Sequence, residues 1–200
     1  MFVHELAELI FPSRCIACGL LGPSICAQCR SGWNPHIYRQ TVGDIPTYSS
    51  VTYSPIAQKV ILASKENSLK EADRLVVEAL MKSLSYLKRE RGLALLVPIP
   101  ARTSSRRRRG RDYILDLVKQ LDVDSVELLS VVKHVRDQST LNHDRRATNL
   151  DHAFEARRCE VGEVILIDDI VTTGATLLEA QRALQRRGIA VKGAITACMA

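Results

Sequence analysis

Long apolar runs, glycine-rich nucleotide-binding loops and low-complexity segments are all missing from this 200-residue sequence. No window approaches the roughly 20 apolar residues that a helix needs to span a bilayer. The first residues, MFVHELAELIFPS, carry acidic side chains where a secretory signal needs a basic segment. We therefore expect a soluble cytoplasmic protein. In that compartment disulfides are rare, and clustered cysteines more often bind a metal.

Two motifs of nucleotide-binding enzymes are also absent. No glycine is followed by lysine, so the chain has no P-loop, and it has no G-x-G-x-x-G fingerprint for a dinucleotide. A strand that ends in acidic residues is therefore not predicted to be the Walker B strand of a P-loop enzyme.

The composition is that of a folded protein, with 46% hydrophobic and 25% charged residues. There are 28 basic and 22 acidic residues, which gives a net charge of +6. The excess is uneven because five arginines gather within six positions: Arg106, Arg107, Arg108, Arg109 and Arg111. A basic balance favours polyanions, either nucleic acid or a polyphosphate metabolite, and does not choose between them.

Four of the six cysteines form two C-x2-C pairs separated by seven residues: Cys15, Cys18, Cys26 and Cys29. Two such pairs can supply four thiolates in the tetrahedral arrangement that zinc prefers. The spacing predicts a structural zinc site in an N-terminal segment over residues 1–40. Two disulfides or free thiols are the alternatives. Because four sulfurs leave no open coordination position, we do not expect this metal to be catalytic.

Residues 41–200 are predicted to form an α/β domain with a parallel sheet flanked by helices, since strand and helix patterns alternate. The expected helices cover 56–63, 70–88, 112–121 and 176–188. The expected strands lie within 47–53, 93–100, 126–135, 163–171 and 189–200.

The segment VILIDDIVTTGAT, from Val164 to Thr176, carries the strongest functional signal. Ligands of such sheets bind outside the carboxyl ends of the strands, where Asp168 and Asp169 would emerge. The turn that follows offers hydroxyl groups, a glycine that allows close backbone approach, and a helix N-terminus that favours an anion. A sugar phosphate fits this segment, because its hydroxyls can donate to the two carboxylates while its phosphate lies in the turn. The alternative is a strand end followed by an ordinary capped helix.

This segment resembles, at every position, the phosphoribosyl pyrophosphate (PRPP) motif of type I phosphoribosyltransferases. The whole chain is similar to the competence-related ComF family, which includes GntX-like proteins. FPSRCIACGLLGPSICAQC matches the family's four-cysteine finger, and LLVPIP with the arginine-rich segment after it matches its centre. DQSTLNHDRRATNL resembles a further family segment, with Gln138, Leu141, Arg145 and Asn149 at the family's spacing.

The resemblance implies a role for each part of the motif. Asp168 and Asp169 would bind the ribose hydroxyls of PRPP, and Mg²⁺ would bridge its pyrophosphate and ribose oxygens. Lys65 falls where the family has a lysine that faces the pyrophosphate; the alternative is a solvated lysine. The 5-phosphate would be held by Thr172, Thr173, Gly174, Ala175 and Thr176.

The arginine-rich segment RTSSRRRRGRDY is predicted to be a mobile loop, because its like charges repel. By the resemblance it would close over the pyrophosphate, and Arg109 would act in catalysis with the two aspartates by stabilising the departing charge. The same arginines could instead contact DNA phosphates or remain solvated. From Arg109 to Tyr113 the chain reads Arg-Gly-Arg-Asp-Tyr, where the family has Arg-Gly-Phe-Asn-Gln. The family's aromatic side chain and both of its amides are missing here, and this departure affects what the resemblance implies about acceptor recognition and turnover.

Three functional hypotheses follow. The first is a magnesium-dependent phosphoribosyltransferase with an unknown acceptor, linked by the resemblance to DNA uptake in natural competence. The second is a non-catalytic nucleotide- or single-stranded-DNA-binding module that works with a competence helicase. The third is a phosphoribosyl-binding protein of nucleotide salvage. We expect His134, His143 and His152 to be surface or loop residues, because they have no nearby nucleophile or metal-ligand spacing.

Overall fold

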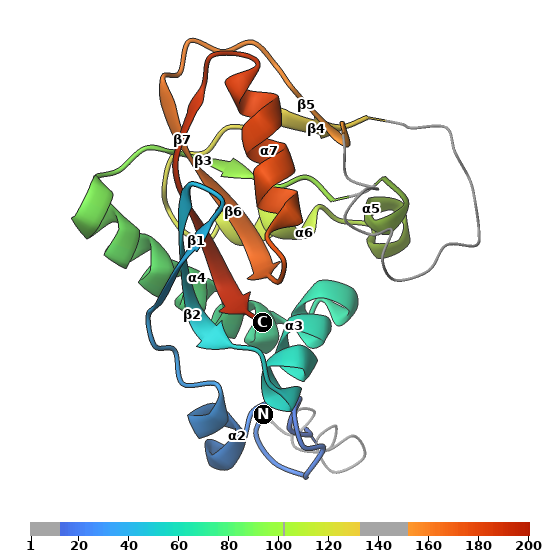
Figure 1. Cartoon of the computed structure of the whole chain (residues 1–200). Helices are drawn as coiled ribbons and strands as arrows, with labels where there is room; N and C mark the ends of the chain where they lie inside the picture. Colours follow the sequence, from blue (N-terminus) through green and yellow to red (C-terminus); the bar gives the residue numbers. More distant parts are fainter. Residues whose placement is uncertain (1–12, 102, 133–151) are drawn as a thin grey trace.

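The computed structural model describes residues 13–101, 103–132 and 152–200 (Figure 1). Within these residues a five-stranded sheet has the order β1-β2-β7-β6-β3. Its strands are β1 (Tyr38–Val42), β2 (Ile45–Thr52), β3 (Leu95–Pro98), β6 (Glu163–Val171) and β7 (Ala190–Met199). The pairs β2–β7, β7–β6 and β6–β3 are parallel, whereas β1 and β2 are antiparallel. The predicted fold class, a parallel sheet flanked by helices, is confirmed.

The aliphatic run of β6 is buried because both faces of the sheet are covered. Val164 and Leu166 pack into one core cluster, and Ile165 and Ile167 pack into another on the opposite face. A strand covered on both faces requires a continuous apolar run, which is what the sequence has before Asp168.

Three helices cover one face of the sheet: α3 (Pro55–Asn67), α4 (Lys70–Arg91) and α6 (Tyr113–Val118). The other face is covered by α7 (Ala175–Gln185), and Figure 1 shows α7 in front of the sheet and α4 behind it. The hydroxyl of Ser54 caps α3 by accepting a hydrogen bond from the Ala57 N–H at 3.1 Å, and Pro55 occupies the first turn. All four predicted helices are present, although α6 and α7 end earlier than expected.

The strand expected within residues 126–135 is the short β4 (Leu129–Val131), whose antiparallel partner is β5 (Phe154–Ala156). These two strands form a separate small sheet beside α7. The family segment with Gln138, Leu141, Arg145 and Asn149 lies outside the described residues, as do His134 and His143.

The sequence did not predict the β1–β2 hairpin. β1 is an edge strand in which half-buried and exposed residues alternate up to Val42, and most of its residues are polar, so its apolar signal is weak. Gly43, with φ +62°, makes the turn between Val42 and Ile45. The predicted domain boundary at residue 40 falls within β1 and remains a prediction.

The prediction of a loop is wrong over Thr103–Arg109, which form the helix α5. The predicted mobility of this segment stays a prediction. Mutual repulsion does not decide the conformation because acidic groups neutralise most of the cluster. The ion pairs are Arg106–Asp112, Arg108–Glu66, Arg109–Glu66 and Arg111–Asp73.

The N-terminal described segment contains the short helix α2 (Ala27–Gly32). Trp33 directly follows this helix and is fully buried in the core that α3 and α4 form against the sheet. Among the described residues, no helix combines the length and the apolar character that crossing a bilayer requires.

Candidate active site and metal centre

A cavity of about 300 Å³ lies where β3 and β6 end and α7 begins. Residues from four separate parts of the chain reach it: the end of α3, the residues after β3, the segment from α5 to α6, and the end of β6 with the turn that follows. Its charged and hydroxyl-bearing lining residues are Lys65, Ser105, Arg109, Tyr113, Asp168, Asp169, Thr172 and Thr176. The carboxyl edge of the parallel sheet thus forms a polar site, as ligand-binding sheets of this class do.

Asp168 and Asp169 extend the buried strand β6 into this cavity. Asp168 is half-buried and its Oδ1 accepts a hydrogen bond from the Asp169 N–H at 2.9 Å, whereas Asp169 is 2% exposed. Burial raises the pKa of Asp168 well above its ordinary value, and the neighbouring charge of Asp169 raises it further. A cationic group or a set of hydroxyl donors would stabilise the charged pair.

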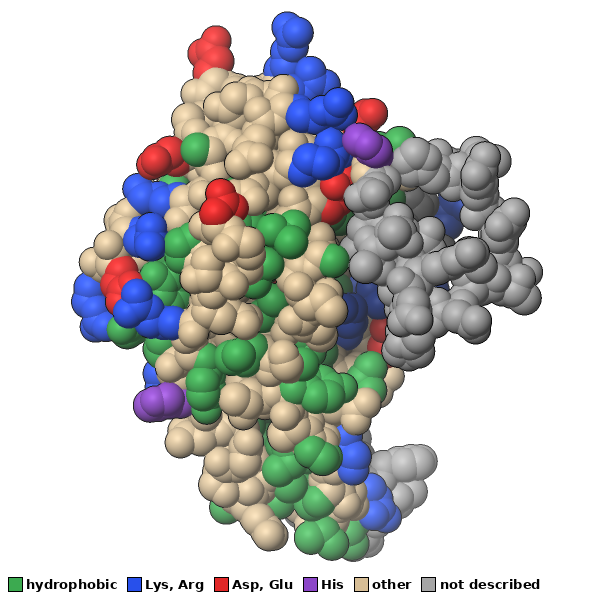
Figure 2. All heavy atoms as spheres, in the orientation of Figure 1, with side chains coloured by type: hydrophobic (Ala, Val, Ile, Leu, Met, Phe, Trp, Pro, Cys, Tyr) green, Lys and Arg blue, Asp and Glu red, His purple; other side chains and the backbone are tan. Residues whose placement is uncertain are grey.

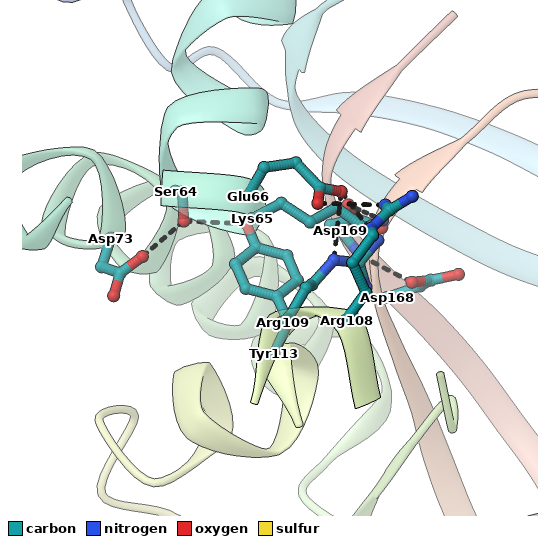
Figure 3. A network of polar contacts seen from close by, with 9 residues as sticks. All are labelled: Ser64, Lys65, Glu66, Asp73, Arg108, Arg109, Tyr113, Asp168 and Asp169. Atoms are coloured by element: carbon teal, nitrogen blue, oxygen red, sulfur yellow. Dashed lines mark hydrogen bonds and ion pairs between the residues drawn. The ribbon is translucent and has the colours of Figure 1, made fainter. Parts of the chain in front are cut away.

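Lys65, at the last turn of α3, supplies one such cation. Its Nζ lies 2.6 Å from Oδ2 of Asp169 and 5.6 Å from the centre of the Tyr113 ring. The side chain is 27% exposed, so it is held in the cavity and is not solvated at the surface. Figure 3 shows Lys65 extending toward Asp169 at the end of the strand.

Arg109 also lines the cavity, but a carboxylate holds its guanidinium. Its Nε and Nη2 donate to Oε1 of Glu66 at 3.0 and 2.8 Å, and Arg108 donates to Oε2 of the same residue at 3.1 Å. The hydrogen bond from Arg109 lowers the pKa of Glu66, even though partial burial opposes this effect. Glu66 therefore ties α5 to the end of α3, and the sequence analysis had assigned it no role.

A buried chain of polar groups lies beneath Lys65. The Ser64 hydroxyl contacts the Tyr113 hydroxyl at 2.9 Å and donates to Oδ1 of Asp73 at 2.6 Å (Figure 3). Arg111 donates to both oxygens of Asp73. Burial raises the pKa of Tyr113, so the phenol stays protonated. One feature of the sequence could have pointed to this buried network, since Asp73 is an acidic residue that interrupts the apolar stripe of α4.

The turn after β6 brings two of the five proposed phosphate-binding residues to the cavity. Thr172 and Thr176 line it, whereas Thr173, Gly174 and Ala175 do not. Gly174 precedes the first turn of α7 with φ +75°, and a Cβ there would lie 2.1 Å from Cγ1 of Val42. The turn can therefore take this shape only with glycine at its close approach to β1.

The four N-terminal cysteines converge on a second site. The sulfurs of Cys15, Cys18, Cys26 and Cys29 all lie within 4.8 Å of one another. Cys18 and Cys26 have their sulfurs 3.8 Å apart, which excludes a disulfide bond between them. This sulfur–sulfur distance equals the edge of about 3.8 Å expected for a tetrahedron of sulfurs with zinc–sulfur bonds of about 2.3 Å. The cluster could hold a metal such as zinc.

The protonation of these thiols fits a metal centre. Burial alone would raise the pKa of Cys15, but backbone N–H groups of Cys18, Cys26 and Ala17 lower it to about 6. Burial and the three neighbouring sulfurs raise the pKa of Cys29 to about 12. Without a cation the four thiols resist joint ionisation, and a divalent metal removes that penalty.

The cavity in turn offers the groups that a ribose phosphate requires. Carboxylates can accept hydrogen bonds from sugar hydroxyls, and a lysine, an arginine and a helix N-terminus can face phosphate. Asp168 has no ion-pair partner among the described residues, so its carboxylate is available to Mg²⁺, which often binds through one or two carboxylates and the substrate's phosphates.

Known proteins resemble this chain to a limited extent. It is 30% identical over 130 residues to Competence protein F of Haemophilus influenzae, across 58% of this chain and 56% of the relative. The chain thus matches a little over half of the relative's length. This agrees with the resemblance to the ComF family. No protein-family model matches.

Two solved structures of adenine phosphoribosyltransferases align with this chain at low sequence identity. An adenine phosphoribosyltransferase aligns with 87% of this chain and 90% of its own at a TM-score of 0.48 and 12% identity. The adenine phosphoribosyltransferase of Saccharomyces cerevisiae aligns with 88% of this chain and 90% of its own chain, at a TM-score of 0.44 and a sequence identity of 11%. The fold class of this chain rests on its own strand order and helix layers.

Proposed function

We propose that the chain binds PRPP together with Mg²⁺ and transfers its phosphoribosyl group to an acceptor. One observation carries this proposal: Lys65 lines one cavity at the carboxyl edge of the sheet with Asp168, Asp169 and Thr172, which lie about a hundred residues later in the chain. Its volume of about 300 Å³ lies at the lower end of the range of ligand pockets.

Each side chain has a defined task in this proposal. Asp168 and Asp169 accept hydrogen bonds from the ribose hydroxyls. Thr172 and Thr176, together with Thr173, Gly174 and Ala175 through the backbone of the turn, hold the 5-phosphate at the start of α7. Lys65 faces the pyrophosphate. Magnesium, when bound, neutralises charge on the pyrophosphate and the ribose oxygens.

In the transfer, the bond between the anomeric carbon and the pyrophosphate oxygen breaks, and the acceptor's nucleophilic atom bonds to that carbon. The leaving oxygen carries the electron pair away, and Arg109 stabilises this charge. The protein contributes positioning and electrostatics, and forms no covalent intermediate. To reach the ligand, Arg109 must exchange its bonds to Glu66 for bonds to phosphate.

Calorimetric titration of Mg²⁺ and PRPP into the metal-loaded protein tests this function. We expect saturable binding that the Asp168→Asn, Asp169→Asn double variant loses. Pyrophosphate release with a pool of nitrogenous acceptors then tests turnover. If binding is absent from the unaltered chain, the proposal fails. Binding without pyrophosphate release would instead favour the non-catalytic nucleotide-binding module.

We further propose that the chain acts in the cytoplasm in DNA uptake, with single-stranded DNA and a competence helicase as partners. The similarity to Competence protein F supports this role. The arginines of α5 support it poorly, because most of them already pair with acidic side chains. A pull-down of the helicase with the full chain tests the partnership.

For the N-terminal segment 1–40 we propose a structural zinc site formed by Cys15, Cys18, Cys26 and Cys29. The short sulfur–sulfur distances and the shifted thiol pKa values support it. The cluster also packs against Ile56 at the start of α3, so a bound metal would brace the finger against the rest of the chain.

A further inference from the structure

A basic groove lies at the C-terminal end of α7, away from the cavity described above. Two open cavities of about 640 and 260 Å³ adjoin there and share Arg186 and Arg187 in their walls. The charged residues that line them are Glu155, Arg158, Glu160, Arg182, Arg186 and Arg187. Figure 2 shows Lys and Arg side chains gathered at this end of the molecule, over the end of α7.

The arginines of this groove differ from those of α5 in their partners. Neither Arg158 nor Arg186 pairs with a carboxylate within the parts of the chain that the structure describes, and both are exposed. The Nε of Arg187 donates a hydrogen bond to the Ala156 carbonyl at 2.9 Å, which fixes the side chain at the rim of the groove. Arg182 pairs with Glu179. With Arg182 paired, the lining still has three arginines against the two carboxylates Glu155 and Glu160, so the groove keeps a small excess of positive charge.

This site is separate from the proposed PRPP cavity. That cavity adjoins the first turn of α7, whereas Arg186 and Arg187 follow its last turn. A helix of 11 residues is about 16 Å long, which places the two sites at opposite ends of it. A ligand in the groove leaves the cavity open.

We propose that this groove binds the phosphodiester backbone of single-stranded nucleic acid without reading its bases. Guanidinium groups match phosphate geometrically, and several of them along an open groove can engage successive phosphates of one chain. A single small anion in so open a site would meet few of these groups at once. Among the described residues, Phe154 is the only aromatic one that lines the groove, and it is 5% exposed, so its ring is not available to stack on bases.

This inference deepens the DNA-related part of the proposed function and does not depend on PRPP. Its test is fluorescence anisotropy of an oligothymidylate of about 16 nucleotides, titrated with the full chain over a series of salt concentrations. The test variant is Arg158→Gln, Arg186→Gln. The matched control is Lys88→Gln, Arg91→Gln, which removes two exposed charges at the end of α4, on the other face of the sheet.

We expect the test variant to bind more weakly at low salt and the slope of log affinity against log salt to fall in magnitude by about 1.4, the value for two lost phosphate contacts. The control should keep the parental slope. An unchanged slope in the test variant, or an equal loss in the control, would overturn the proposal. Circular dichroism confirms that each variant is folded.

Cys159 provides a readout located in the groove itself, because it lines the larger cavity and is exposed. We expect saturating oligonucleotide to protect Cys159 from alkylation, which mass spectrometry of its peptide measures, and to protect it less in the Arg158→Gln, Arg186→Gln variant. Absence of protection would overturn the site. Competition by inorganic pyrophosphate at equal phosphate concentration would also overturn it, in favour of a small-anion site. PRPP titration of the same variants separates the two proposals, since PRPP binding should be unchanged.

Discussion

The ammonium group of Lys65 lies 2.6 Å from a carboxylate oxygen of Asp169, although 104 residues separate the two along the chain. Asp169 is almost fully buried, so Lys65 provides the counter-charge that its ionised form requires. A ligand with hydroxyl groups and phosphates can replace both halves of this pair: hydroxyls donate to Asp169 while phosphate accepts from Lys65. This pair is therefore charge-neutral before a ligand arrives.

Replacing Asp168 by asparagine should stabilise the unliganded protein at neutral pH. Because burial raises the pKa of Asp168 in the folded state, ionisation at neutral pH costs folding free energy. That cost vanishes as the pH falls through the folded pKa toward the unfolded value of about 3.9. Thermal unfolding of Asp168→Asn and of the parent should thus differ most near neutrality and converge in acid. A variant that is less stable than the parent at pH 7 would contradict this reading.

Replacing Gly174 by alanine should destabilise the turn that begins α7. The new Cβ would meet Cγ1 of Val42 at 2.1 Å, and the positive φ adds strain. Gly188→Ala is the matched control, because Gly188 also has φ +75° and has open space around it. We expect the control to cost about 1 kcal/mol and Gly174→Ala about 1–3 kcal/mol more in urea unfolding. Equal costs would mean that the contact with Val42 relaxes freely.

Replacing Glu66 by glutamine should strengthen pyrophosphate binding. The change removes the carboxylate that holds Arg108 and Arg109, so the guanidinium groups can turn to phosphate. We expect affinity to rise by up to about fivefold, which corresponds to roughly 1 kcal/mol of ion-pair energy. Calorimetry with Mg²⁺ and pyrophosphate measures this. Glu71→Gln, which removes an exposed charge from the first turn of α4, should change nothing. Weaker binding in Glu66→Gln would show that Glu66 positions the arginines productively.

Chelation of the bound metal should expose four thiols together. In the metal-loaded chain we expect alkylation of Cys159 and protection of Cys15, Cys18, Cys26 and Cys29. After chelation these four should react, because a divalent ion no longer occupies their sulfurs. Mass spectrometry counts the labels, and elemental analysis should find about one zinc per chain before treatment. Cys159→Ser should lose a single label and retain the metal. Alkylation of all four cysteines before chelation would rule out the site.

Local patterns in the sequence were sufficient to predict several elements of the structure. The aliphatic run before Asp168 predicted β6, since a strand buried on both faces must be apolar throughout. The spacing of Cys15, Cys18, Cys26 and Cys29 predicted their convergence, because each C-x2-C pair turns the backbone over a few residues. The apolar periodicity of α4 predicted a long helix on one face of the sheet.

The edge strand β1 and the helix α5 were missed because their signals are not local. β1 is stabilised by pairing with β2 and carries little apolar pattern of its own. Five neighbouring arginines suggested repulsion, but the acids that neutralise them include Glu66 and Asp73, more than thirty residues earlier in the chain. Charge balance in a folded protein depends on neighbours in space, which a sequence read residue by residue does not supply.

The sequence by itself determined which residue types were available to the chemistry: four clustered cysteines, a carboxylate pair at a strand end and a hydroxyl-rich turn. Tertiary structure alone decided which of the charged groups remain free. It paired Lys65 with Asp169 and Arg109 with Glu66, and it left Arg158 and Arg186 without carboxylate partners among the described residues. The physical reason is that the energy of a charge depends on the groups within a few ångströms and on the water excluded around it, and both are fixed only when distant segments pack together.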